Sequence, residues 1–359
     1  MNALQEAKHL GQHIWLDNLT RRLLRPDGLP RLIERDGVSG VTSNPSILHK
    51  AVSGSPEYAT DLARLKTVAL TPEQRYERLV IPDIQAACEL LWPVYEASAG
   101  DDGYVSLEVS PRLADDESAT VQAATRLHAL VNRQNALIKV PATGAGRRAF
   151  EHLIGAGINV NVTLMFSLQH VVEVAQAYTR GLHRWLERGG DAHHPKAVAS
   201  LFLSRVDTLV DQRLEALASP EALALRGQTA VALAKLAYQR YRDLFHQAPF
   251  ADLRRRGARP QYLLWASTGT KNPAYSDVQY VEPLIGPETI NTLPDATLAA
   301  FRDHGRARLT LEEGVEEAQA HVLALEKLGI DLHATGETLQ RQGVELFDTA
   351  YTRLLDLVK

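Results

Sequence analysis

Eight short apolar runs are spaced along this chain, and sequence of helical character follows each of them. The runs lie at 13–17, 40–46, 104–109, 136–140, 157–166, 197–203, 261–267 and 289–293. Such alternation is typical of an α/β protein with a parallel sheet, and eight units fit a closed barrel better than an open doubly wound sheet. No Gly-x-Gly-x-x-Gly follows the first run, which weakens the dinucleotide-binding alternative. The pattern therefore predicts a single (β/α)8 TIM barrel.

Two stretches exceed what such a barrel needs. The long connection 47–100 predicts a helical insertion, and 305–359 predicts a C-terminal helical extension with helices at 313–328 and 336–358. Because we find no repeat, low-complexity tract or linker, we expect residues 1–359 to form one domain. The apolar stripe of the last helix consists of Leu346, Phe347, Tyr351 and Leu354. It fits either a lid over the barrel mouth or ordinary core packing.

Composition excludes several classes of partner. The chain has 39 basic and 43 acidic residues mixed along 359 positions, and no basic block of the size that nucleic-acid binding needs. Its start lacks the apolar core of a signal peptide, and no run of roughly 18 apolar residues suggests a membrane span. The one cysteine, Cys88, cannot form an internal disulfide. We therefore expect a cytoplasmic protein without nucleic-acid or membrane partners, and the sequence carries no signal of its oligomeric state.

Metal chemistry has no support either. The 13 histidines are scattered, no His-Glu-x-x-His occurs, and a single cysteine offers no cluster of ligands. No Gly-x-Ser-x-Gly elbow is present, which disfavours a serine hydrolase. We predict no metal site and no cofactor.

A lysine in the middle of an apolar run is the most unusual single feature. Lys139 lies in the run 136–140, which Pro141 ends, and lysine is almost never buried without a partner. A structural ion pair, or a lysine at the surface of a wrongly assigned strand, would explain it. The alternative is a lysine whose amine is kept partly neutral by desolvation and acts as a nucleophile toward carbonyls.

Polar residues gather toward the carboxyl ends of the first five runs. They are Asp17, Asn44, Glu108, Lys139, Asn159, Asn161 and Thr163. The alternation of the last three with apolar residues would also suit a sheet with one wet face. In a barrel, however, such residues face the interior, and the carboxyl ends of the strands form the catalytic face. We therefore predict a site at this face.

The loop after the seventh run has the composition of a phosphate site. Residues 267–273 read Ser-Thr-Gly-Thr-Lys-Asn-Pro, and Arg205 just past the sixth run could add a planar donor. In these barrels the loops after strands seven and eight often bind phosphate. An ordinary turn with exposed charge would explain the same residues.

Taken in order, the segments 15–17, 42–46, 106–109, 137–143, 159–167 and 291–294 resemble the strand motifs of the transaldolase family. The most specific are the lysine motif Leu-Ile-Lys-Val-Pro-Ala-Thr at 137–143 and the Asn-x-Thr motif at 161–163. The similarity runs from about residue 13 to 301. The long second connection and the extended tail resemble the longer transaldolase subfamily.

The resemblance implies a class I Schiff-base reaction of the non-oxidative pentose phosphate pathway, without a cofactor. Lys139 would attack the ketone of sedoheptulose 7-phosphate, cleavage would release erythrose 4-phosphate, and the bound dihydroxyacetone unit would add to glyceraldehyde 3-phosphate to give fructose 6-phosphate. Glu108 and Thr163 would handle protons through a water, and Asp17 would act on the substrate hydroxyl. The residues implied in substrate binding are Asn44, Asn161, Ser200 and Phe202 for the sugar, and Arg205, Ser267 and Lys271 for phosphate.

One departure from the family pattern concerns the phosphate loop. The better-known transaldolases have Ser-x-Arg-Asn there, whereas this loop is two residues longer and has Lys271 in place of arginine. Lysine lacks the bidentate fork of arginine, and the sequence leaves both possibilities for Lys271: binding the phosphate in place of the arginine, or not.

Two other readings compete. Fructose-6-phosphate aldolases of the same superfamily release free dihydroxyacetone. That group typically has glutamine at the position of Glu108 and tyrosine at the position of Phe202, whereas this chain has the residue that resembles transaldolase at both positions. A barrel that binds sugar phosphates without turning them over would have no reason to keep a buried lysine beside a carboxylate.

Overall fold

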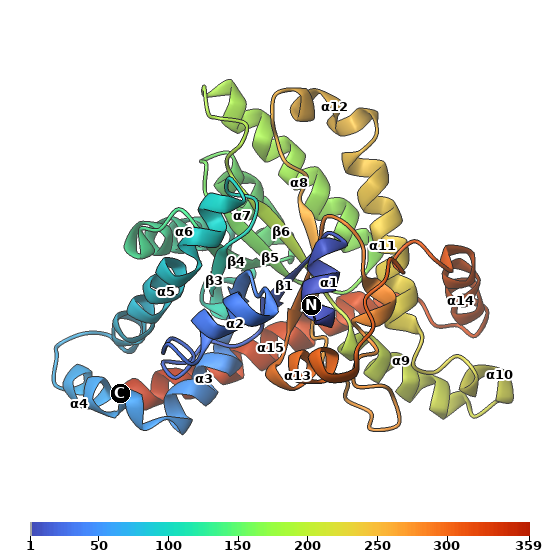
Figure 1. Cartoon of the computed structure of the whole chain (residues 1–359), viewed down its shortest axis with the longest axis horizontal. Helices are drawn as coiled ribbons and strands as arrows, with labels where there is room; N and C mark the ends of the chain where they lie inside the picture. The colour runs from blue at the N-terminus through green and yellow to red at the C-terminus, as the bar shows by residue number, and fades with distance from the viewer. Residues whose placement is uncertain (1) are drawn as a thin grey trace.

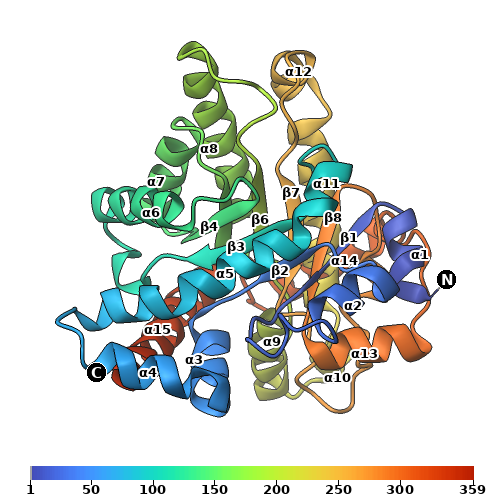
Figure 2. The same cartoon turned by 60° about the vertical axis from the view of Figure 1, so that its left-hand side comes forward.

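The computed structural model describes residues 2–359 and contains a closed barrel of eight parallel strands (Figures 1 and 2). Each strand pairs with its neighbours in sequence order, and the last pairs with the first. The strands are β1 Gln12–Leu16, β2 Gly40–Thr42, β3 Tyr104–Glu108, β4 Ala136–Pro141, β5 Val160–Met165, β6 Ala197–Phe202, β7 Tyr262–Ala266 and β8 Thr289–Leu293. The predicted (β/α)8 barrel is confirmed.

Helices alternate with the strands and supply the additional elements. The α-helices are α1 Ala3–His9, α2 Leu29–Asp36, α3 Pro45–Gly54, α4 Ala59–Lys66, α5 Pro72–Ala97, α6 Glu117–Val131, α7 Gly144–Ile154, α8 Leu168–Glu187, α9 Ser204–Leu217, α10 Pro220–Leu223, α11 Thr229–Phe245, α12 Ala248–Arg255, α13 Asp295–His304, α14 Val315–Lys327 and α15 Leu332–Val358. Short 3-10 helices are η1 Pro56–Tyr58, η2 Pro111–Leu113 and η3 Glu282–Leu284. The connection from β2 to β3 is helical, as predicted, and so is most of the segment after β8.

The second strand is shorter than its predicted range of 40–46, because its last residues begin a helix instead. Asn44 caps α3: its Oδ1 accepts a hydrogen bond of 3.0 Å from the backbone N–H of Ile47. Pro45 has no N–H to give to a sheet and suits the first turn of a helix. Asn44 is therefore held at the mouth of the barrel by a helix N-terminus.

The long helix α15 crosses the molecule and ends beside α4 (Figures 1 and 2). It packs on α3, α5, α9 and the end of β5. Phe347, Tyr351 and Leu354 are buried, whereas Leu346 is 54% exposed and does not belong to the buried stripe. Because the helix contacts the barrel and the insertion, we propose that all of these elements belong to one domain.

Candidate functional site

Lys139 lies inside the barrel, near the carboxyl end of β4. Its side chain is 5% exposed, and its Nζ donates a hydrogen bond of 3.0 Å to the backbone carbonyl of Ser43. Glu108 on β3 is its partner in the strand register, so both side chains project into the same layer of the barrel. Lys139 Nζ lies 3.4 Å from Glu108 Oε2. A buried amine thus faces a buried carboxylate.

One carboxylate oxygen of Glu108 is free to accept a proton. Its Oε2 is buried and finds no well-aligned hydrogen bond among residues 2–359, although it lies at ion-pair distance from Lys139. Burial raises the pKa of Glu108, while the charge of Lys139 opposes that shift. A carboxylate with a raised pKa beside an amine suits general acid–base chemistry.

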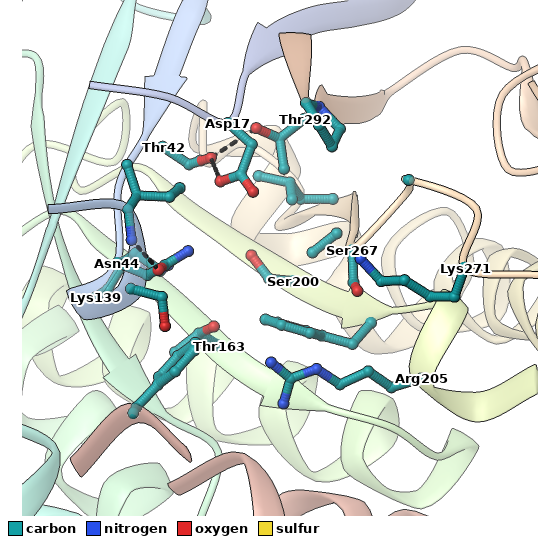
Figure 3. Close-up of a pocket in the computed structure, with 18 residues that line it drawn as sticks. Asp17, Thr42, Asn44, Lys139, Thr163, Ser200, Arg205, Ser267, Lys271 and Thr292 are labelled. Atoms are coloured by element: carbon teal, nitrogen blue, oxygen red, sulfur yellow. Dashed lines mark hydrogen bonds between the residues drawn. The ribbon is translucent and has the colours of Figure 1, made fainter. Parts of the chain in front are cut away.

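Asp17 directly follows β1 and is held by Thr42, which in turn bonds to Thr292 (Figure 3). Thr42 Oγ1 donates a 2.6 Å hydrogen bond to Asp17 Oδ1 and lies 2.6 Å from Thr292 Oγ1. Burial raises the pKa of Asp17, and the Thr42 hydrogen bond and the charges of Lys139 and Lys271 oppose the shift. The carboxyl group is oriented toward the cavity and can exchange a proton there.

Asn161 and Ser200 form a hydrogen-bonded pair across neighbouring strands. Ser200 Oγ donates to Asn161 Oδ1 at 2.7 Å, and Asn161 Nδ2 donates to Ser106 Oγ at 3.1 Å. Thr163, further along β5, is buried, and its Oγ1 has no hydrogen-bond partner in the described part of the chain. It is therefore available to a water or a substrate.

Asn159 does not share this environment, and its predicted place at the catalytic face is wrong. It precedes β5, where its Nδ2 donates to the carbonyl of Gln134 at 2.7 Å and its Oδ1 accepts from the N–H of Lys196 at 2.9 Å. Because side chains two positions apart share a face but differ in depth, alternation alone did not fix the level within the barrel.

A cavity of about 190 Å³ opens among these residues (Figure 3). Its lining contains the predicted residues Asp17, Asn44, Lys139, Thr163, Ser200, Phe202, Arg205, Ser267 and Lys271. Glu108 and Asn161 are outside this lining, but each touches a residue of it. The fold thus brings together predicted site residues from all of the first seven strands and the loops that follow them.

Nine further lining residues were not predicted as site residues: Thr42, Ser46, Ile47, Leu264, Ala266, Gly269, Thr292, Pro294 and Phe347. Thr42, which bonds to Asp17, and Thr292, which bonds to Thr42, lie at strand ends within the recognised motifs, so their position offered a signal. Phe347 comes from α15, far along the chain, and its stripe fitted packing equally well.

The side of the cavity opposite Lys139 is cationic. Figure 3 shows Arg205, Ser267 and Lys271 together there. Arg205 Nη1 is buried without a hydrogen-bond partner among residues 2–359, and burial lowers the pKa of its guanidinium. Ser267 adopts a left-handed φ of 54°, and its Oγ lies 2.8 Å from that of Ser204. An anion entering here would meet the cationic side chains of Arg205 and Lys271, for which residues 2–359 provide no ion-pair partner.

The loop that carries Lys271 is fixed to α9 by two tyrosines. Tyr275 Oη donates to Asp211 at 2.7 Å, and Tyr280 Oη donates to Asp207 at 2.8 Å. Burial raises the pKa of Asp207 to about 6, and its hydrogen bonds oppose that shift. These contacts hold Lys271 at the rim of the cavity.

Among residues 2–359, no group of three or more His, Cys, Asp and Glu side chains is placed to hold a metal ion. None of the helices in this range is long and apolar enough to cross a membrane.

Comparison with known proteins gives a consistent result along the whole chain. Residues 14–358 match the family described as transaldolase/fructose-6-phosphate aldolase. A transaldolase of Thiobacillus denitrificans is 57% identical over 355 residues, which cover 99% of both chains. A transaldolase of Neisseria gonorrhoeae is 47% identical over 355 residues, again 99% of both chains, and transaldolase 2 of a Nostoc strain is 41% identical over 367 aligned residues, 99% of this chain and 96% of its own. This chain belongs to the transaldolase/fructose-6-phosphate aldolase family.

Proposed function

We propose that this protein is a transaldolase of the pentose phosphate pathway, which transfers a dihydroxyacetone unit from sedoheptulose 7-phosphate to glyceraldehyde 3-phosphate. The products are erythrose 4-phosphate and fructose 6-phosphate. The observation that carries the proposal is the amine of Lys139, buried in the barrel 3.4 Å from Glu108 and open to the cavity. Relatives named transaldolase, aligned over the full length, support the same activity.

The proposed first step forms an imine. The Lys139 amine attacks the ketone carbon of the donor sugar, and loss of water gives a protonated iminium. Glu108 accepts and returns the protons that this step needs through a water, which Thr163 Oγ1 orients because that oxygen has no protein partner among residues 2–359. The iminium then serves as the electron sink of the cleavage.

Cleavage and transfer require a second base. Asp17 takes the proton from the hydroxyl group on the fourth carbon, the bond between the third and fourth carbons breaks, and erythrose 4-phosphate leaves as the aldehyde. The resulting enamine on Lys139 adds to the aldehyde carbon of glyceraldehyde 3-phosphate, and Asp17 returns the proton to the new hydroxyl. Hydrolysis of the iminium releases fructose 6-phosphate and restores the amine.

The remaining residues position the sugar phosphate. Asn44 and the Asn161–Ser200 pair are suited to hold the hydroxyls of the three-carbon unit next to Lys139. Phe202 forms part of the cavity wall. We assign the phosphate group to Arg205, Ser267 and Lys271, because they lie together at the cationic side of the cavity. Lys271 contributes a point charge here rather than a bidentate contact.

Two assays test this proposal. A coupled assay with fructose 6-phosphate and erythrose 4-phosphate, run with and without chelator, should show transfer. Borohydride added with fructose 6-phosphate should fix a three-carbon adduct on the peptide that contains Lys139. Steady release of free dihydroxyacetone without transfer would indicate a fructose-6-phosphate aldolase instead, and binding without any adduct would indicate a non-catalytic barrel.

The only cysteine, Cys88, is buried and unpaired, which is compatible with a reducing compartment. We therefore propose a cytoplasmic enzyme that acts on small sugar phosphates.

A further inference from the structure

One side chain of the C-terminal helix reaches the cavity. Phe347 on α15 is 2% exposed and forms part of the cavity lining, next to residues of the barrel proper. Arg205, which begins α9 with Ser204, lines the same cavity. The two residues are separated by more than a third of the chain, so only the packing of α15 brings them together.

The face of α15 that points to the barrel permits a very close approach. Gly336, Gln340 and Gly343 are spaced so that they share this face with Phe347. Gln340 Nε2 donates a 3.0 Å hydrogen bond to the carbonyl of Leu164. A Cβ atom at Gly336 would come within 2.8 Å of Ser167 Cβ, so this helix face has no room for a larger residue.

Leu164 explains why a carbonyl of β5 is free for this bond. Its φ of 60° is left-handed, and the pairing of β5 with β6 shifts register between Val162 and Met165. Such an irregularity removes the carbonyl of Leu164 from the hydrogen bonds between the strands, and Gln340 supplies the hydrogen bond that this carbonyl would otherwise lack. At Gly343, a Cβ would meet Leu164 Cδ2 at 2.8 Å and Arg205 Nη1 at 3.7 Å. The helix backbone thus forms part of the wall beside the guanidinium.

Two aromatic rings flank the Arg205 guanidinium. Its Cζ lies 5.8 Å from the ring centre of Phe202 on β6 and 5.9 Å from that of Phe347 on α15. Phe166 in turn backs Phe202, with ring centres 5.2 Å apart. Aromatic faces attract a cation without using its N–H groups. The guanidinium is therefore restrained while its donors remain free, as the unpartnered Nη1 indicates.

We propose that Phe347 is a positioning residue for substrate phosphate: together with Phe202 it holds the guanidinium of Arg205 toward the cavity, so that α15 helps select phosphorylated sugars. This inference rests on the proposed assignment of Arg205 to phosphate binding. It predicts an effect on the binding of the phosphate group and little effect on chemistry at Lys139, which lies on the opposite side of the cavity.

The test separates the aromatic contact from simple packing. Phe347→Leu keeps an apolar side chain of useful size but removes the aromatic face, whereas Phe347→Tyr keeps the face. We measure kcat and KM for fructose 6-phosphate with erythrose 4-phosphate as acceptor, and the competitive Ki of inorganic phosphate. Phe347→Leu should raise KM and Ki together by about 3- to 30-fold, the range expected for a partly desolvated cation–aromatic contact, and should leave kcat within about 3-fold. Phe347→Tyr should restore values close to those of the unmodified enzyme.

Tyr351→Leu is the matched control on the same helix. Tyr351 contacts the guanidinium of Arg112 with its ring centre 5.7 Å from Cζ, the same type of contact, but it does not line the cavity. This variant should leave KM and the Ki of phosphate unchanged. Equal increases in Phe347→Leu and Tyr351→Leu would mean that both act through helix docking, which would overturn the inference.

Arg205→Gln separates the role of Arg205 in phosphate binding from the role of Phe347 in positioning Arg205. If it raises the Ki of phosphate and Phe347→Leu does not, the role of Phe347 is wrong and the phosphate site stands. If Arg205→Gln also leaves Ki unchanged, the phosphate assignment itself fails, and the inference fails with it.

Discussion

Two lysines are buried at opposite ends of the same barrel, and their surroundings differ in one decisive respect. Lys139 lies near the carboxyl end of β4, and Lys196 lies directly before β6, at the amino-terminal end. Their side chains are 5% and 1% exposed. Each lies close to a carboxylate, so neither burial nor charge pairing distinguishes them.

Lys196 and the charged groups around it are paired with one another. Its Nζ lies 2.7 Å from Asp101 Oδ1 and 3.9 Å from the ring centre of Tyr262, whose hydroxyl donates to Asp101 at 3.2 Å. Next to it, Asp102 lies 2.5 Å from His13 Nδ1 and accepts from Trp15 Nε1 at 2.9 Å. Burial lowers the pKa of Lys196, and Asp101 opposes that shift. This network lies at the amino-terminal end of the barrel.

The side chains around Lys139, in contrast, leave buried oxygen atoms without hydrogen bonds. Its carboxylate partner is 3.4 Å away, and buried oxygens of Glu108 and Thr163 have no hydrogen-bond partner within residues 2–359. Unsatisfied buried polar atoms cost stability and persist where another molecule completes them. The comparison suggests that a buried lysine serves stability where its partners are complete, and chemistry where they are not.

The largest expected effect is at Lys139. We expect Lys139→Ala to lower kcat/KM at least about 10⁴-fold, because the imine cannot form, while the barrel stays folded. The coupled transfer assay measures the loss, and circular dichroism with thermal unfolding checks the fold. Substantial transfer by this variant would defeat the Schiff-base mechanism.

Glu108→Gln tests whether the carboxylate next to Lys139 transfers protons during the reaction. The change should lower kcat about 10²- to 10³-fold through loss of proton transfer. As Glu108 must be ionised to accept a proton, the acid limb of kcat/KM in the unmodified enzyme should lie above the ordinary pKa of 4.5. An unchanged rate in the variant would contradict the proton role.

Lys196→Met should give the opposite pattern. Removing one partner leaves Asp101 without its main counter-charge, so we expect the free energy of unfolding to fall by about 3 kcal/mol. At a temperature where the variant is folded, kcat should stay within about twofold of the unmodified value. Urea unfolding and the transfer assay together give both quantities, and a large loss of kcat in folded protein would undermine the distinction between the two lysines.

The smallest expected effect is a loss of stability in acid that depends on Asp102, at the amino-terminal end of the barrel. Burial alone would raise the pKa of Asp102, but the charge of His13 and the hydrogen bonds from His13, Ser39 and Trp15 outweigh it, and the pKa falls to about 2, below the ordinary 3.8. A lowered folded-state pKa stabilises the protein above the unfolded value, and this stability disappears as the pH falls through about 2. Between pH 5 and 2, the unmodified protein should therefore lose about 2 kcal/mol more than Asp102→Asn, measured by urea unfolding.

Much of the fold could be predicted because its signals are local. Each strand is a short apolar run, and several helices have a side-chain N-cap, such as Ser167 before α8. Among site residues, Lys139 and Glu108 were predicted because charged residues are unusual within buried runs. Asn159 was misplaced, because the depth of a side chain in a barrel depends on the stagger of neighbouring strands. Lys196 attracted no prediction, since its partner Asp101 is 95 positions away in the sequence.

The sequence by itself determined the barrel and the residue types at the carboxyl ends of its strands, because periodicity and strand ends are properties of neighbouring positions. Only the tertiary structure decided that Glu108 stands opposite Lys139 in the register, that Lys196 pairs with Asp101 at the amino-terminal end of the barrel, and that Phe347 of α15 flanks Arg205. These contacts join residues that are distant along the chain. Strand register, barrel closure and helix docking set them, and no local pattern encodes those three properties.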